Sequence, residues 1–287
     1  MRSRLPLALA TFALLAGCTA APPRPASAPG AAANDNLDAV AWTQTAIEHD
    51  LVYLQTYRDA QSRLLAALRD PHWDALTQED RVAPAADLPP AVVLDIDETV
   101  LDNSPYQARL LKSGGQYDAA SWAAWCREER ARALPGALAF TRFAAAHGIA
   151  VIYLSNRARE LDTATLANLR KLGFPVSGPE AFLGLGTTVP GCEQQGTGKG
   201  CRRQLVSRSY RVLMQFGDQL GDFVDVAANT AAGRRQAIAG YMGWVGVRWF
   251  VLPNPSYGAW EPALFGNNWG AAPAERRRMK LDSLRYN

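Results

Sequence analysis

Residues 91–106 are AVVLDIDETVLDNSPY, and this stretch decides the fold. Four apolar residues lead directly into three acids within four positions, Asp95, Asp97 and Glu98. Carboxylates this close repel one another, and burying a charge without a partner is costly. The pattern therefore predicts a buried strand that ends in a cation site, and a metal ion is the expected cation.

Outside this stretch, apolar segments of strand length alternate with segments of helical periodicity. Further strands are expected at GIAVIYLS from Gly148, at 210–218 and at 245–253, and helices at 37–69, at 122–133, up to Ala146 and at 160–172. Apolar strands separated by helices of this length argue for a parallel sheet with helices on both faces. We therefore predict an α/β fold with a Rossmann-like parallel sheet and a small helical accessory region.

The carboxyl ends of the expected strands carry polar side chains. The first strand ends at Asp95 and the second at SNR, residues 155–157. The third ends at Asp218, with Asp222 four residues further on. In a parallel α/β sheet these ends lie on one edge, where ligands bind. Because oxygen-only ligands favour magnesium over zinc or copper, the sequence predicts a Mg²⁺ site at this edge.

Several segments resemble one known family. DIDETVLDN is similar to the DxDx[TV] motif of haloacid dehalogenase-like phosphatases, and the chain resembles the class C acid phosphatases of the bacterial lipoprotein e family. The similarity runs in chain order through LDIDETVLDNSPY, WAAW, YLSNR, GDQLGDF and VLPNPSYGAWE, and includes the earlier AWTQTAIEHDLVYLQTYRDA. It covers roughly residues 37–270. The resemblance implies a magnesium-dependent acid phosphatase or 5′-nucleotidase, with nucleoside 5′-monophosphates and aryl phosphates as expected substrates.

The resemblance also implies catalytic and metal-binding roles. Asp95 is the expected nucleophile, which forms an aspartyl-phosphate, and Asp97 is the expected general acid and then base. Ser155 and Lys199 are expected to contact the phosphoryl group. The expected magnesium ligands are the carboxylates of Asp95 and Asp218 and the main-chain carbonyl of Asp97.

Supporting roles follow from the same resemblance. Thr99 is expected to order the motif loop, and Asp222 to hold Lys199 or a metal-bound water. Lys199 lies in KGCRRQ, where Arg202 or Arg203 is the alternative for the same role.

Substrate contacts are expected beside these groups, from two polar residues and three aromatic candidates for stacking on a base or ring: Asn156, Arg157, Tyr106, Trp125 and Tyr257. Trp122 and Trp125 lie at helical spacing, for which packing in the core is the default, so a stacking role for Trp125 competes with a place in the core.

The amino-terminal segment is typical of an exported lipoprotein. Two arginines precede an apolar run over residues 5–16, which is too short to span a bilayer as a mature helix. The run ends in LAGC, residues 15–18, which resembles a bacterial lipobox. We therefore expect a lipoprotein signal peptide over residues 1–17 and lipidation of Cys18. An ordinary signal peptide with a chance cysteine is the alternative.

The next segment, residues 18–36, is rich in Ala, Pro and small polar residues, which predicts a flexible tether. A single phosphatase domain is expected over residues 37–287. Thr19 follows Cys18, a pattern that favours outer-membrane sorting. The expected location is the bacterial cell envelope, with a lipid anchor in the outer membrane and the enzyme facing the periplasm.

The remaining cysteines fit export. Cys192 and Cys201 flank a loop rich in glycine and polar residues, and a disulfide closing this loop is predicted for an oxidising compartment. Cys126 would then stay a buried thiol, and three reduced cysteines are the alternative. The formal net charge is +3, and the basic cluster at residues 275–280 is typical of a solvated helix face.

The expected partners are therefore a small phosphomonoester and a membrane, reached through the amino-terminal lipid, with no nucleic acid polymer. A homodimer is left open. Two alternatives for the function stay open as well. One is a phosphatase for sugar phosphates or other small phosphoesters, and the other is a non-catalytic surface binding lipoprotein with the same fold.

Overall fold

The apolar strands form a parallel sheet, as the sequence predicts. The computed structural model describes residues 35–286, and within them one sheet has five strands in the order β5-β4-β1-β6-β7. These strands are β1 (Pro90–Leu94), β4 (Ala150–Ala158), β5 (Phe182–Leu185), β6 (Arg211–Gly217) and β7 (Trp249–Val251). β1 lies at the centre and pairs in parallel with β4 and β6. Both neighbours cover its edges, so β1 and β6 are almost entirely buried.

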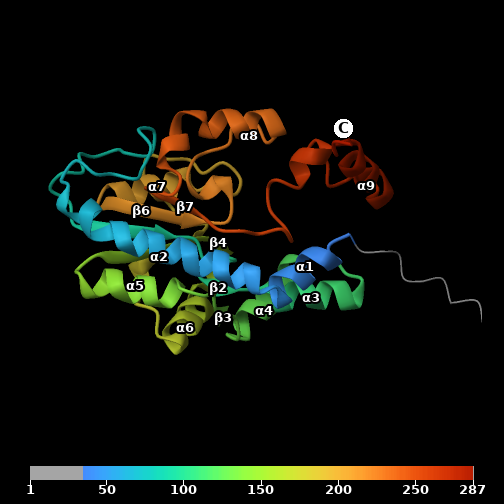
Figure 1. Cartoon of the computed structure of the whole chain (residues 1–287), viewed down its shortest axis with the longest axis horizontal. Helices are drawn as coiled ribbons and strands as arrows, with labels where there is room; N and C mark the ends of the chain where they lie inside the picture. Colours follow the sequence, from blue (N-terminus) through green and yellow to red (C-terminus); the bar gives the residue numbers. More distant parts are fainter. Residues whose placement is uncertain (1–34, 287) are drawn as a thin grey trace, which may run out of the picture. The chain divides into compact units, whose positions relative to one another are not determined.

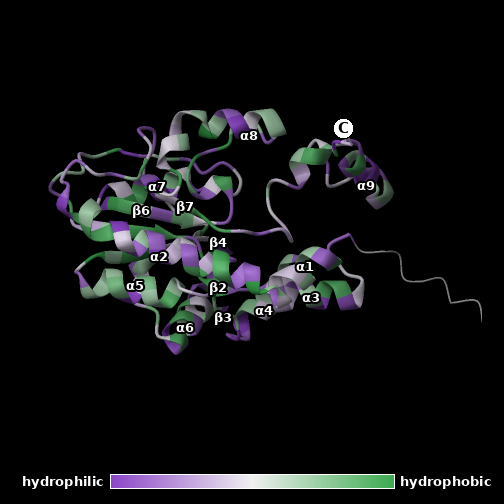
Figure 2. Cartoon of the chain, in the orientation of Figure 1, coloured by the Kyte–Doolittle hydropathy of each residue, from purple (hydrophilic) through white to green (hydrophobic). Residues whose placement is uncertain are grey.

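Helices cover both faces of this sheet (Figure 1). The α-helices of the described residues are α1 (Leu37–Thr45), α2 (Ile47–Arg69), α3 (Ser104–Ser113), α4 (Ala119–Arg127), α5 (Ala137–Ala146), α6 (Asp162–Leu172), α7 (Gly200–Ser207), α8 (Ala231–Ile238) and α9 (Pro273–Asp282). Side chains of α2, α5 and α6 pack on one face, and side chains of α7 and α8 pack on the other. The last helix, α9, is largely hydrophilic (Figure 2) and contributes no buried residue.

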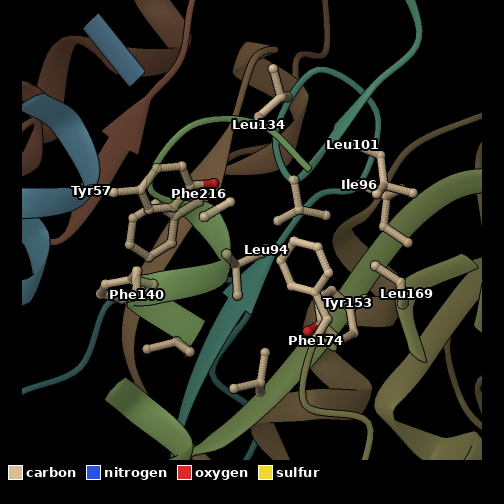
Figure 3. Close-up of a cluster of buried hydrophobic side chains, with 14 of the residues drawn as sticks. Tyr57, Leu94, Ile96, Leu101, Leu134, Phe140, Tyr153, Leu169, Phe174 and Phe216 are labelled. Carbon is tan, nitrogen blue, oxygen red and sulfur yellow. The ribbon is translucent and has the colours of Figure 1, made fainter. Parts of the chain in front are cut away.

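A cluster of aromatic rings fixes α2 and α5 against the sheet (Figure 3). The ring of Phe216 on β6 stacks on Tyr57 of α2 with centroids 5.3 Å apart, and it lies 4.6 Å from the ring of Phe140 on α5. Full burial of one such side chain stabilises the fold by about 1.5–3 kcal/mol. Gly136 has a φ of +86°, and a Cβ there would lie 2.9 Å from Cβ of Tyr57. The helix α5 can therefore approach α2 this closely because residue 136 is glycine.

The accessory region lies between β1 and β4. It contains α3, α4 and a two-stranded antiparallel sheet of β2 (Leu101–Asp102) and β3 (Arg132–Ala133). Side chains from α3 and α4, among them Tyr106 and Trp125, join the same core as α2. This region therefore packs directly beside the carboxyl end of β1.

The structure corrects several expected boundaries. The predicted helix over 37–69 is two helices, because Ala46 adopts an extended conformation. The helix expected to continue to residue 133 ends at Arg127, and Glu129 then has a φ of +52°. The fourth predicted strand, 245–253, is only the three residues of β7. The sequence patterns did not predict β5, α3, α7 or α8.

The predicted signal peptide, the lipidation at Cys18 and almost all of the predicted tether lie outside the described residues. Among residues 35–286, no helix has both the length and the apolar character needed to cross a membrane.

Candidate active site

The loop after β1 is held from two sides. The backbone N–H of Asp95 donates to the carbonyl of Phe216 on β6, at 3.0 Å. The hydroxyls of Tyr53 and Tyr57 on α2 donate to the carbonyls of Glu98 and Thr99. Glu98 has a φ of +53°, an unusual conformation for a residue with a Cβ, and these contacts maintain it. The long helix α2 therefore fixes the turn that presents Asp95 and its neighbours.

Lys199 is the basic residue that reaches Asp95. Its Nζ lies 2.5 Å from Oδ1 of Asp95, 2.7 Å from Oδ1 of Asp222 and 2.8 Å from the carbonyl of Leu154. Burial disfavours the ammonium form, but the charges of Asp222 and Asp95 outweigh it and raise the pKa of Lys199. Lys199 is therefore a buried, permanently charged group between two carboxylates.

The two alternatives to Lys199 lie elsewhere. Arg202 donates to the carbonyl of Ser155 at 2.5 Å and to Oδ1 of Asn156 at 2.7 Å. Arg203 pairs with Asp80 and Asp225 at 2.6 and 2.8 Å. Both arginines are fully buried, and they fix loops around the site without contacting Asp95.

Asp97 is enclosed by donors. Nδ2 of Asn103 and Nε of Arg157 both lie 2.9 Å from Oδ1 of Asp97, and Nη2 of Arg157 lies 2.8 Å from the same oxygen. The hydroxyl of Ser155 donates to Oδ2 at 3.3 Å. Thr99 is buried next to this loop, and its carbonyl accepts the bond from Tyr57. The carboxylate of Asp97 is thus fixed in direction and balanced by one guanidinium.

Three other carboxylates converge at the sheet edge. Asp95, Asp218 and Asp222 each offer an oxygen within 4.8 Å of the others. Burial raises the pKa of Asp95 to about 7; Lys199 opposes the shift, and the charges of Asp222 and Asp97 add to it. Burial, Asp222 and Asp95 likewise raise the pKa of Asp218. Since Lys199 is the cation paired with this cluster within residues 35–286, the donors present fit an additional divalent cation.

The oxygens of the cluster differ in how they are used. Oδ1 of Asp222 contacts Lys199, and its Oδ2 accepts a 2.8 Å bond from the backbone N–H of Gln219. Oδ2 of Asp218 accepts bonds from the side-chain amides of Gln219 and Asn254, at 2.7 and 2.8 Å. The structure brings Asp218 to Asp95, as the predicted metal site requires, and it gives Asp222 the contact with Lys199.

Two predicted substrate-stacking residues lie in the core, and the prediction is corrected for them. Tyr106 is 2% exposed and Trp125 is 3% exposed. The hydroxyl of Tyr106 bonds Ser121, and the indole N–H of Trp125 donates to Oδ1 of Asn103 at 2.8 Å. Helical spacing indicated an inward face for the ring of Trp125, and that face packs the scaffold. Trp125 thereby orients Asn103, which in turn bonds Asp97.

Two tyrosines close to the acids differ from Tyr106 and Trp125 in being at least partly exposed, Tyr257 and Tyr117. Tyr257 is half-buried, and its backbone N–H and carbonyl contact Asn254 and Gln219 beside Asp218. Tyr117, which the sequence patterns did not predict, is 63% exposed and meets the ring of Tyr106 edge-on. Partial desolvation raises the pKa of Tyr117, and the negative groups around it, among them Asp97, add to the shift. Tyr117 lies between two helices and outside every motif, so no local signal marks it.

The two polar residues after Ser155 also differ from expectation. Arg157 is 1% exposed and uses its guanidinium on Asp97, on Oδ1 of Asn103 and on the hydroxyl of Thr165. The predicted contact between Arg157 and substrate is therefore replaced by an ion pair with Asp97. Asn156 is exposed at the same edge, with its Oδ1 bound by Arg202.

The loop before α7 is closed covalently. Cys192 and Cys201 form a disulfide with their Cα atoms 5.5 Å apart, and Lys199 lies two residues before the second cysteine. Among the described cysteines, Cys126 is free and buried. The disulfide therefore anchors the segment from which Lys199 enters the site.

Three amide side chains were missed by sequence reasoning, Asn103, Gln219 and Asn254. Each lies inside a motif segment: DIDETVLDN, GDQLGDF and PNPSYGAWE. Each contacts an acid of the site. Their position beside the acids was visible, but an amide's hydrogen-bond partner is not encoded by local periodicity.

Fold and site together define a haloacid dehalogenase-like protein, with a carboxylate cluster and a lysine at the carboxyl edge of its parallel sheet. The family described as HAD superfamily, subfamily IIIB (acid phosphatase), matches residues 25–260. The chain therefore belongs to this subfamily, which confirms the predicted family and fold class.

Solved structures agree with this assignment. The chain is similar to the class C acid phosphatase from Bacillus anthracis, solved alone and with tungstate bound. In both cases the identity is 34% and the TM-score 0.74, over 88% of this chain and 97% of that chain.

Two curated plant proteins are more distant relatives. They are the stem 28 kDa and stem 31 kDa glycoproteins of Glycine max, each 27% identical over 58% and 57% of this chain, respectively. The chain spans 58% and 50% of the length of these two relatives.

Proposed function

We propose that this protein is an acid phosphatase that hydrolyses phosphomonoesters through an aspartyl-phosphate on Asp95, with Mg²⁺ as cofactor. The observation that carries the proposal is the contact between Asp95, at the end of β1, and the buried ammonium of Lys199 inside a cluster of carboxylates. A nucleophile beside a fixed positive charge suits attack on a dianionic phosphoryl group. The tungstate bound by the similar Bacillus anthracis enzyme, a tetrahedral oxyanion, supports a phosphoryl site here.

In the first step, a carboxylate oxygen of Asp95 attacks phosphorus, and the bond from phosphorus to the leaving oxygen breaks. Asp97 enters this step protonated, the form that the second step regenerates, and gives its proton to that oxygen, so an alcohol leaves. Arg157 and Asn103 hold Asp97 in one direction for this transfer. Lys199 balances the phosphoryl charge, and the Ser155 hydroxyl, which bonds Oδ2 of Asp97 in the absence of substrate, would turn to donate to a phosphoryl oxygen.

In the second step, Asp97 takes a proton from water while the water oxygen attacks phosphorus, and the acyl-phosphate bond to Asp95 breaks. Inorganic phosphate leaves, and the carboxylate of Asp95 is restored. Mg²⁺, held by Asp95, Asp218 and the carbonyl of Asp97, would supply further neutralisation of phosphoryl charge. Oδ1 of Asp218 receives no hydrogen bond from the described residues, which leaves it available for such a role.

The test is release of phosphate from a panel of monoesters after removal of metal and after return of Mg²⁺, Ca²⁺ or Zn²⁺. Turnover that depends on Mg²⁺ is expected. A folded protein that releases no phosphate from any monoester would overturn the assignment and favour a binding protein. Turnover unaffected by metal removal would overturn the metal dependence alone.

We propose nucleoside 5′-monophosphates and aryl phosphates as the preferred substrates, because an aromatic side chain stands near the acids. Base stacking on an aromatic ring contributes about 1–3 kcal/mol. Replacement of Tyr257 by alanine should therefore raise KM for nucleotides by about ten-fold, since 1.4 kcal/mol corresponds to one decade. A small phosphoester without a ring should be affected little. Equal losses on both would mean that Tyr257 packs the loop, and a preference for ring-free substrates would favour a sugar phosphatase.

We propose that the mature enzyme is lipid-anchored through Cys18 in the cell envelope, at the outer membrane facing the periplasm. The support is the LAGC sequence after a short apolar run, and the Cys192–Cys201 disulfide suits an oxidising compartment. Replacing Cys18 by alanine should abolish incorporation of labelled fatty acid and move the enzyme out of the membrane fraction. Unchanged labelling would contradict the anchor.

A further inference from the structure

The turn after β6 and the loop after β7 are joined by two side-chain amides. Nε2 of Gln219 donates to Oδ2 of Asp218 at 2.7 Å and lies 3.4 Å from the carbonyl of Tyr257. Its Oε1 accepts a 3.1 Å bond from the backbone N–H of Ala259. The amide nitrogen of Gln219 thus contacts both Asp218 and the 254–259 loop. The amide oxygen contacts a second position of the same loop.

Asn254 repeats this arrangement from the other side. Its Nδ2 donates to the same oxygen, Oδ2 of Asp218, at 2.8 Å. Its Oδ1 accepts from the backbone N–H and hydroxyl of Ser256, at 3.0 and 2.8 Å, and from the N–H of Tyr257 at 3.3 Å. Both amides therefore bond Oδ2, which leaves Oδ1 of Asp218 without a hydrogen bond from the described residues.

Gly258 makes the close approach of Gln219 feasible. Its φ is +149°, and a Cβ there would stand 2.3 Å from Oε1 of Gln219 and 2.4 Å from its Nε2. An amide with free space could move aside, but this one is held by Asp218 and Ala259. Any side chain at residue 258 would therefore have to displace the Gln219 amide from Asp218 or shift the loop.

We propose that Gln219 and Asn254 are positioning residues that couple metal binding at Asp218 to the substrate loop, residues 254–259. The inference rests on the proposed function, because it takes Asp218 as a metal ligand and Tyr257 as a substrate contact. Groups that orient a metal ligand affect the affinity for the metal. An amide that bonds both the ligand and the loop therefore couples metal binding to the conformation of the loop. Displacing either amide should weaken both Mg²⁺ binding at Asp218 and substrate binding at the loop. Loosening the loop at a point that leaves the amides in place should weaken substrate binding alone.

The first experiment measures binding of Mg²⁺ alone by calorimetry. Gln219→Met keeps the length of the side chain and removes the amide. It should raise the Mg²⁺ dissociation constant by about ten-fold, the lower end of the range for loss of a partner of a metal ligand. Its KM for a nucleotide should rise as well. An unchanged Mg²⁺ dissociation constant in a folded Gln219→Met protein would overturn the proposal.

The second experiment uses two substitutions that both loosen the loop and differ in their path to Asp218. Gly258→Ala displaces the Gln219 amide and should weaken Mg²⁺ as Gln219→Met does. The control is Asn229→Ala, because Asn229 bonds the carbonyl of Ala259 at 2.9 Å on the same loop and does not contact Asp218. Asn229→Ala should raise KM for nucleotides and leave Mg²⁺ affinity unchanged.

If Asn229→Ala weakens Mg²⁺ binding as much as Gly258→Ala does, any loosening of the loop affects the metal. That result would overturn the proposal that Gln219 provides the coupling. If Gln219→Met does not fold, Gly258→Ala carries the same test, with thermal melting as the check. Wild-type protein that binds no Mg²⁺ would reject the proposed metal site itself. By contrast, Mg²⁺ binding by the wild type that the substitutions do not change would overturn only the proposed coupling.

Discussion

Asp95 and Asp97 are two residues apart, yet the fold surrounds them in opposite ways. Asp97 lies among directed donors, and the buried guanidinium of Arg157 balances its charge. Asp95 shares Lys199 with Asp222 and lies beside Asp218, so negative charge exceeds positive charge around it. One motif therefore supplies two acids with different surroundings. Asp97 is held by donors and paired with a guanidinium, whereas Asp95 lies in a cluster whose excess negative charge favours a further cation.

Because of this contrast, substitutions at Asp95 and at Asp97 should impair the site in different ways. In the proposed mechanism Asp95 is both nucleophile and metal ligand, so loss of its charge should remove both functions together. Loss on the Asp97 side should impair proton transfer and leave the cation cluster intact. Substitutions ordered by their expected effect can test this division.

Asp95→Asn should have the largest effect. The amide keeps the shape of the side chain but cannot form the acyl-phosphate, so phosphate release should fall by about four orders of magnitude or more, as for removal of other nucleophiles. Colorimetric phosphate release on a protein with an unchanged circular dichroism spectrum is the measurement. Substantial turnover by such a protein would falsify the covalent step.

Asp97→Asn should reduce turnover by about 10²–10⁴-fold, the range for general acid–base catalysis. Alkyl phosphates should lose more than aryl phosphates, whose leaving groups need less protonation. Excess Mg²⁺ should not restore activity, because the missing group is a proton donor. Steady-state kinetics on a matched alkyl and aryl pair decides this, and equal losses on the two would count against the role.

Asp218→Asn should be the mildest of the three acid substitutions, because excess metal can compensate for a weaker site. At limiting Mg²⁺ the loss should be about two orders of magnitude, since charge stabilisation by a metal ion is worth several kcal/mol. Titration with Mg²⁺ should recover much of it. Absence of any recovery at high Mg²⁺ would place Asp218 outside the metal site.

The smallest expected effect is on stability as a function of pH. The pKa of Asp95 is raised from 3.8 to about 7 in the folded protein, so its proton favours the folded state. This contribution is complete below the ordinary pKa and is lost as pH rises through about 7, so metal-free protein should melt a few degrees lower at about pH 8 than at about pH 5.

The matched variant for this test is Asp95→Asn, whose melting temperature should change less with pH than that of the wild type. Mg²⁺ should raise the wild-type melting temperature most at high pH, where the carboxylates are charged. A wild-type protein and an Asp95→Asn protein with parallel pH profiles would contradict the raised pKa.

The sequence was sufficient to predict the central strand and the acids at its end, because an apolar run that stops abruptly at charged residues is typical of a buried strand that leads into a ligand site. It also located Ser155 and Asp218, since the carboxyl ends of parallel strands must meet at one edge. β5 was not predicted, because four residues with an internal glycine are too few to show the alternation typical of a strand. Lys199 came from the family resemblance, since a glycine-rich loop has no pattern that aims its side chains.

The aromatic residues and Arg157 show where local pattern stops. A ring at helical spacing gives the same pattern whether it faces the core or the mouth of the site, so Trp125 could not be assigned from sequence. Arg157 follows Ser155 at the functional edge, but its partner is set by convergence with a loop 60 residues earlier. Such long-range pairing depends on the assembled sheet.

The two tyrosines of α2 determine where this enzyme can be divided. A fragment that begins at β1 would retain every motif from DIDETVLDN to PNPSYGAWE. It would lack Tyr53 and Tyr57, whose hydroxyls hold the carbonyls of Glu98 and Thr99. The catalytic loop is therefore not an autonomous module, and any truncation, fusion or circular permutation of the chain has to treat the amino-terminal helix as part of the active site.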